Sequence, residues 1–121
     1  MATYIVLFGY TQLGIENVKE SPARVDAAEK AFKTVGAKVK EFYAVMGMSH
    51  YDTIFILEAP DDETVAKAVL TIGSVGNVRT ETHRAFTQAE FKKIVAGLPS
   101  TLGKDRLMSN RESEDIVGGL P

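Results

Sequence analysis

Two stretches of the chain, residues 4–10 and 53–59, are apolar without polar alternation. A strand with one solvated face alternates apolar and polar residues, whereas a strand covered on both faces does not. Both stretches are rich in β-branched and aromatic residues. We therefore predict two central strands. Residues 38–46 alternate, and residues 78–86 are polar at both parities, so these two stretches predict edge strands.

Helical signals fall between these strands. Ser21 and Pro22 suit the N-cap and first position of a helix that ends before Gly36. Pro60-Asp61-Asp62 ends a strand and caps a second helix, which continues to about residue 75. Thr87 to Glu90 has the capping-box pattern, which predicts a short helix to about residue 96. Residues 11–19 form a connection.

The resulting order is β-α-β-β-α-β with an extra C-terminal helix. With right-handed crossovers, this order predicts an α+β, ferredoxin-like domain over residues 1–99, with strand order 4-1-3-2. We expect the first and third strands to be central and parallel. Residues 100–121 are a polar tail with an apolar, glycine-containing end.

The pattern also predicts self-association. Two helices cover one face of a four-stranded sheet, yet the central strands are apolar on both faces. A second copy of the sheet, packed face to face, is the simplest cover for the other face. We therefore expect a homodimer or a higher homo-oligomer.

Composition narrows the functional classes. The 121-residue chain has a formal charge of −2, which argues against nucleic-acid binding through a broad basic surface. We expect no membrane segment, because no apolar run reaches the length of a spanning helix, and no signal peptide, because the first residues lack a basic region. The chain has no Cys, which removes disulfides, thiolate metal sites and Cys nucleophiles and is compatible with a cytoplasmic location.

The first candidate site is His50-Tyr51-Asp52, just before the strand at residues 53–59. An Asp beside a His can orient the imidazole and raise its basicity, as general acid–base catalysis requires. Alternate strand residues share a face, so His50 and Asp52 can act together. The structural alternative is a solvated turn His and an Asp that caps the strand entry.

The second candidate site is the fourth strand. Its antiparallel pairing with the first strand places Arg79, Glu81 and His83 on one face. The register we predict pairs these residues with Tyr10, Phe8 and Val6, respectively. Titratable groups beside an apolar wall are typical of binding sites, and the alternative is an edge strand that charge protects from aggregation.

Other residues extend these candidates. The four tyrosines, Tyr4, Tyr10, Tyr43 and Tyr51, can line an aromatic ligand pocket, or they can be core and interface residues. A metal site would require residues from both candidate sites to converge from different strands, so we expect no metal and no cofactor.

Several segments of the chain resemble GYD-domain proteins. The similarity covers about residues 1–99, and the segments that carry it are residues 1–7, 14–19, 21–24, 36–43, 58–62, 76–82 and 84–87. The Gly-Tyr-Asp signature has its counterpart in Gly47 and Tyr51-Asp52, with Met48, Ser49 and His50 between them. The resemblance implies the dimeric α/β-barrel fold, a group that includes cofactor-independent monooxygenases, isomerases and proteins without known activity.

Two functions follow as alternatives. The first is a non-catalytic module that binds a small molecule or assembles with other proteins. The second is a cofactor-independent enzyme for a small organic acid, enol or phenol, in which His83 or His50 moves a proton. The tail adds a third surface, because a polar spacer with an apolar end can dock on a protein partner or on the chain's own dimer.

Overall fold

The computed structural model describes residues 1–99, so the predicted docking tail lies outside the described residues. The elements follow the predicted order and confirm the α+β, ferredoxin-like class with an extra helix. They are β1 (Ala2–Tyr10), α1 (Gln12–Glu16), the 3-10 helix η1 (Val18–Glu20), α2 (Ser21–Val35), β2 (Lys38–Ala44), β3 (Thr53–Ala59), α3 (Asp62–Ser74), β4 (Val78–Ala85) and α4 (Gln88–Ala96).

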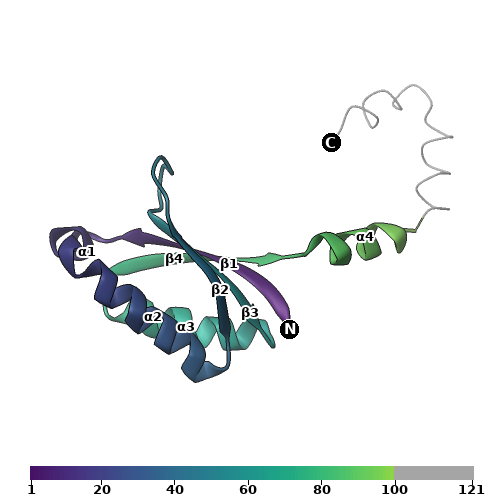
Figure 1. Cartoon of the computed structure of the whole chain (residues 1–121), viewed down its shortest axis with the longest axis horizontal. Coiled ribbons are helices and arrows are strands. Elements are labelled where there is room, and N and C mark those ends of the chain that lie inside the picture. The colour runs from purple at the N-terminus through teal and green to yellow at the C-terminus, as the bar shows by residue number, and fades with distance from the viewer. Residues whose placement is uncertain (100–121) are drawn as a thin grey trace. The chain divides into compact units, whose positions relative to one another are not determined.

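The four strands form one sheet in the predicted order, β2-β3-β1-β4 (Figure 1). The prediction that the first and third strands run parallel is wrong, because β1 and β3 are antiparallel. The reason is the hairpin between β2 and β3. The crossover through α2 makes β2 run parallel to β1, and the turn after β2 then reverses the chain, so that β3 is antiparallel to both. Every neighbouring pair in the sheet is therefore antiparallel.

The predicted register of the fourth strand is also wrong, by one residue. The β4 residues pair with β1 residues one position earlier than expected: Gly9 with Arg79, Leu7 with Glu81 and Ile5 with His83. A shift of one residue moves every side chain to the other face of a sheet. Two contacts from Thr11 hold the observed register. Its N–H donates to the Asn77 carbonyl over 3.1 Å, and its hydroxyl donates to the Gly76 carbonyl over 2.6 Å.

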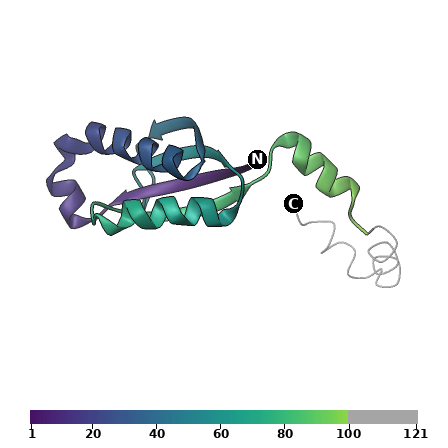
Figure 2. The same ribbon diagram turned by 90° about the horizontal axis from the view of Figure 1, so that it is seen from below.

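One face of the sheet packs against α2 and α3 (Figures 1 and 2), and we call it the inner face. Its centre is aromatic, since the Phe55 ring lies 4.9 Å from Phe8, 5.4 Å from Phe32 and 4.9 Å from Phe42, centroid to centroid. The core residues are all less than a tenth exposed: Tyr4, Val6, Phe8, Ala28, Phe32, Ala37, Phe55, Leu57, Ala59, Val65 and Ala68.

The other face, which we call the open face, carries the alternate strand residues. Its central side chains are aliphatic and half-buried: Ile5, Leu7, Ile54 and Ile56. Both helices α2 and α3 lie on the inner face, so no helix within residues 1–86 covers the open face (Figure 1). These aliphatic side chains contact their neighbours within the sheet only in part, so they remain partly exposed to water.

Helix α4 belongs to a second compact unit that begins at Thr87. The predicted capping box is confirmed: the Thr87 hydroxyl accepts from the Glu90 N–H, and the Glu90 carboxylate accepts from the Thr87 N–H. The helix has one exposed apolar stripe at helical spacing, formed by Phe91, Ile94 and Val95, and the exposed Leu98 follows the end of the helix.

None of the described helices is both long enough and apolar enough to cross a membrane.

Candidate functional site

The predicted site residues divide between the two faces of the sheet. The strand register places Tyr43, Arg79, Glu81 and His83 on the open face, where Tyr51 also contacts Glu81. Tyr10 and Asp52 instead line a cavity on the inner face. The predicted site residues therefore form two separate groups, one on each face of the sheet.

Glu81 is the centre of the polar cluster on the open face. One carboxylate oxygen lies 2.6 Å from His83 Nε2, and the other accepts the Tyr51 hydroxyl over 2.9 Å. The hydrogen bond with His83, followed by that with Tyr51, holds the pKa of Glu81 below its ordinary value. The same contact with Glu81 raises the pKa of Tyr51. Tyr51, Glu81 and His83 therefore form a connected chain of titratable groups at the surface.

Arg79 organises the connection between β2 and β3. Its guanidinium donates to the Tyr10 carbonyl over 2.7 Å and to the His50 carbonyl, and it lies 5.6 Å from the centre of the Tyr51 ring. Gly9 leaves room for this contact, because a Cβ there would lie 2.8 Å from both the guanidinium and the His50 oxygen. Arg79 thus anchors the segment that carries His50 and Tyr51.

Asp52 has a similar anchoring role. Its carboxylate accepts the Tyr10 N–H over 2.9 Å, its N–H donates to the Phe8 carbonyl over 2.8 Å, and its carbonyl accepts the Val45 N–H over 2.8 Å. The structure therefore gives the Asp52 carboxylate a backbone partner on β1. His50, the predicted partner, meets Arg79 through its main-chain carbonyl.

Within residues 1–99, no group of three or more His, Asp or Glu side chains is placed to hold a metal ion. His83 and Glu81 are close, while His50 and Asp52 are held by the separate contacts described above. The hydrogen bonds of Glu81 with His83 and Tyr51 make proton transfer and hydrogen bonding the candidate chemistry of the open face.

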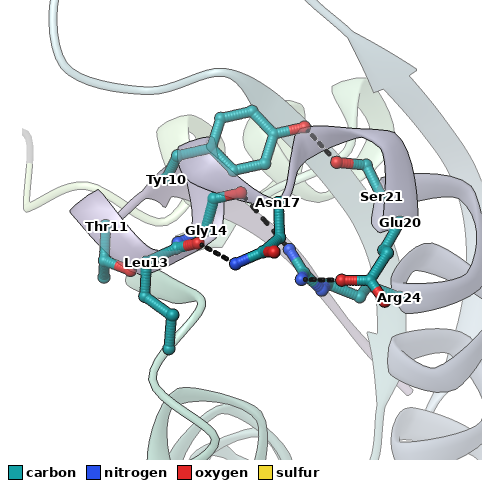
Figure 3. Close-up of polar contacts among 8 residues, drawn as sticks. All are labelled: Tyr10, Thr11, Leu13, Gly14, Asn17, Glu20, Ser21 and Arg24. Carbon is teal, nitrogen blue, oxygen red and sulfur yellow. Dashed lines mark hydrogen bonds and ion pairs between the residues drawn. The ribbon is translucent and has the colours of Figure 1, made fainter.

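The inner face holds a cavity of about 210 Å³ between β1, β3, α2 and α3. Its wall is mainly apolar, and its polar side chains are Tyr10, Ser21, Arg24, Asp52, Thr53, Thr71 and Asn77. The Tyr10 and Ser21 hydroxyls are 2.7 Å apart, and Arg24 pairs with Glu20 over 3.0 Å (Figure 3). Neither histidine lines this cavity.

Sequence reasoning missed the cavity residues Ser21, Arg24 and Asn77. Ser21 was expected to be an N-cap, but Glu20 occupies the N-cap position and Ser21 is the first residue of α2. Its hydroxyl is therefore available to Tyr10. Pro22 could have indicated this start of the helix. Proline is tolerated throughout the first turn of a helix, so Pro22 at the second position makes Ser21 the first helical residue.

Comparison with known proteins identifies the family of this chain. The GYD domain family matches residues 4–95. A Thermus thermophilus protein described as "Glutamine synthetase and cystathionine beta-lyase binding protein" is 36% identical over 91 residues, which cover 74% of this chain and 94% of the relative.

Solved structures with similar chains include one from Thermus thermophilus, with 30% identity and a TM-score of 0.47, covering 72% of this chain and 95% of that one. A homoserine dehydrogenase from Thiobacillus denitrificans has a TM-score of 0.49 and 13% identity, covering 69% of this chain and 17% of that one. The family match and the curated relative, both spanning most of the described domain, show that this chain belongs to the GYD-domain family.

Proposed function

We propose that this protein is a homodimeric binding module that holds a protein partner. The observation that carries the proposal is the open face, whose four central aliphatic side chains have no helix above them within residues 1–86. Exposed apolar patches of this kind mark interaction surfaces in soluble proteins.

A second copy of the chain fits this face best. Polar groups border the apolar centre on both sides: Lys40 on the edge strand β2 pairs with Glu58 on β3 over 3.6 Å, and Glu81 pairs with His83 on the edge strand β4. An apolar centre with a polar rim is the usual anatomy of a protein interface. Two identical sheets can pack face to face about a two-fold axis, which buries both apolar centres together.

The partner class comes from the relative. That protein is named for binding glutamine synthetase and cystathionine beta-lyase, and it is similar to this chain over 94% of its own length. We infer a role of the same kind here, namely the holding of a metabolic enzyme by the dimer. Such a role places the protein in the cytoplasm with that enzyme.

Light scattering tests the dimer. We expect the wild-type chain to have twice its mass of 13.2 kDa at micromolar concentration. Leu7→Glu introduces a charge at the centre of the open face and should give a folded monomer. Leu70→Glu is the matched control, because Leu70 is 72% exposed on α3, and it should remain dimeric. A monomeric wild type would refute the dimer.

A binding experiment tests the partner. Glutamine synthetase and cystathionine beta-lyase from the same organism are passed separately over the immobilised full-length protein. We expect saturable binding of at least one enzyme by the wild type and by Leu70→Glu. If neither enzyme binds while the protein is a dimer, the partner class is wrong and the dimer proposal stands.

One observation favours the enzymatic alternative, and this is the connected chain of Tyr51, Glu81 and His83. A cofactor-independent enzyme for a small organic acid, enol or phenol would use His83, or His50, to move a proton. NMR titration of both histidines with a panel of such compounds tests this role. Histidine signals that stay unchanged with every compound would exclude it.

A further inference from the structure

The cavity on the inner face lies between the sheet and helices α2 and α3. Aromatic and aliphatic side chains from five elements form its wall: Phe8, Phe55, Val25, Ala28, Ile72 and Val78. Protein interiors are otherwise packed at the density of organic crystals, so an apolar space of about 210 Å³ is unusual. Apolar cavities of about 150 Å³ are known to hold benzene. This cavity therefore has room for one substituted benzene ring.

A ligand can reach the cavity from solvent. Val75 lines it while being 66% exposed, and Ala27 lines it from an exposed position on α2. Both residues therefore belong to the cavity and to the protein surface. The space is an open pocket, which solvent molecules and small solutes can enter without unfolding of the domain.

Hydrogen-bonding groups are available at the pocket wall. The hydroxyls of Tyr10 and Ser21 are 2.7 Å apart, so they share one hydrogen bond (Figure 3). Each hydroxyl has one proton and can accept bonds, so a single shared bond leaves one proton and further acceptor capacity unused. A ligand hydroxyl can therefore join this pair as donor, as acceptor or as both.

The two charged side chains that line the pocket already have hydrogen-bonding partners. Arg24 pairs with Glu20 over 3.0 Å and donates to the Gly14 carbonyl over 3.3 Å, while Asp52 accepts the Tyr10 N–H. Arg24 and Asp52 also carry opposite charges, so the pocket offers no net attraction to an anion or a cation. An ionic ligand would compete with these partners for the charge of Arg24 or Asp52, whereas a neutral ligand would not.

We propose that the pocket binds a neutral, hydroxyl-bearing molecule of the size of one substituted benzene ring. The ring fills the apolar space between α2 and the sheet, and the hydroxyl bonds to Tyr10 and Ser21. This site is independent of the proposed dimer contact, because the pocket lies on the inner face and the dimer contact on the open face.

NMR titration of the full-length protein with p-cresol tests the proposal. We expect saturable shifts of cavity-lining amides, and weaker binding both of toluene, which lacks the hydroxyl, and of phenylacetate, which is charged. Absence of saturable shifts with p-cresol up to its solubility limit would refute the site. Binding of phenylacetate as tight as that of p-cresol would refute the preference for a neutral ligand.

Two variants locate the binding. Ala31→Leu fills the pocket and should weaken p-cresol binding by about tenfold or more, whereas Ala23→Leu, an exposed position on α2 outside the pocket, should not. Ser21→Ala removes one hydroxyl and should weaken p-cresol binding by about fivefold, without affecting toluene. Wild-type affinity in both Ala31→Leu and Ser21→Ala would overturn the assignment, even if the protein is a dimer.

Discussion

The inner and open faces of the sheet are built from alternating residues of the same strands, and yet their surroundings differ completely. On β3, Phe55 and Leu57 are no more than 1% exposed, while Ile54 and Ile56, which alternate with them, are only half-buried. The side chains are similarly apolar, so the difference arises from the helices, which cover one face only. Within residues 1–86, apolar side chains thus lie on a sheet face that no helix covers, which is the physical basis for the proposed dimer.

The largest expected change in the free energy of unfolding comes from a substitution on the inner face. Phe55→Ala removes a ring that contacts three other phenylalanine rings, so it should lower the free energy of unfolding by about 3–5 kcal/mol. Phe86→Ala is the matched control, because Phe86 is 53% exposed, and it should change that free energy by less than about 1 kcal/mol. Urea unfolding measures both. Equal losses would mean that the aromatic cluster does not dominate the core.

A pair of glycines gives the next largest effect. Gly9→Ala places a Cβ 2.8 Å from the Arg79 guanidinium and the His50 oxygen, so it should destabilise the protein by about 1–3 kcal/mol. Gly73→Ala meets nothing within 4 Å inside α3 and should stabilise the protein by up to about 1 kcal/mol. Thermal unfolding should therefore shift in opposite directions. A neutral Gly9→Ala would show that Arg79 does not anchor the segment before β3.

A smaller effect is expected from the polar cluster of the open face. The pKa of Glu81 is lowered in the folded protein, so its carboxylate stabilises the fold at pH values above the ordinary pKa of 4.5. This stability is lost as the pH falls through the lowered pKa. NMR titration of the Glu81 carboxyl carbon measures the pKa. We expect His83→Gln to raise the pKa of Glu81 more than Tyr51→Phe does. An unchanged pKa in both variants would contradict the cluster.

The smallest effect lies outside both faces, at the start of α4. Thr87→Ala removes the capping hydroxyl and should destabilise this helix by about 1 kcal/mol. Hydrogen exchange of the α4 amides should accelerate accordingly, while that of β1 should not change. Gln88→Ala, at the first helical position, keeps the cap and serves as the control. Faster exchange throughout the sheet would mean that the two units unfold together.

The sequence by itself determined the element order, the central position of β1 and β3, and the helix caps at Asp61 and Thr87. These features depend on local signals: unbroken apolar runs, and side chains that satisfy the first N–H groups of a helix. The run of polar residues before β3 made Tyr51 a candidate site residue, and the expected pairing of the fourth strand with the first did the same for Glu81 and His83. The structure brings the three together on the open face in a register one residue away from the predicted one.

Tertiary structure decided the strand register and the cavity. The residues of β1 are apolar at both parities and those of β4 are polar at both, so shifting one strand by a residue leaves the hydrophobic pattern equally satisfied. Contacts from distant segments, such as the Thr11 N–H to the Asn77 carbonyl, select one register. The pocket beside Tyr10 and Ser21 depends in the same way on how α2 and α3 lie over the sheet, which no local pattern encodes.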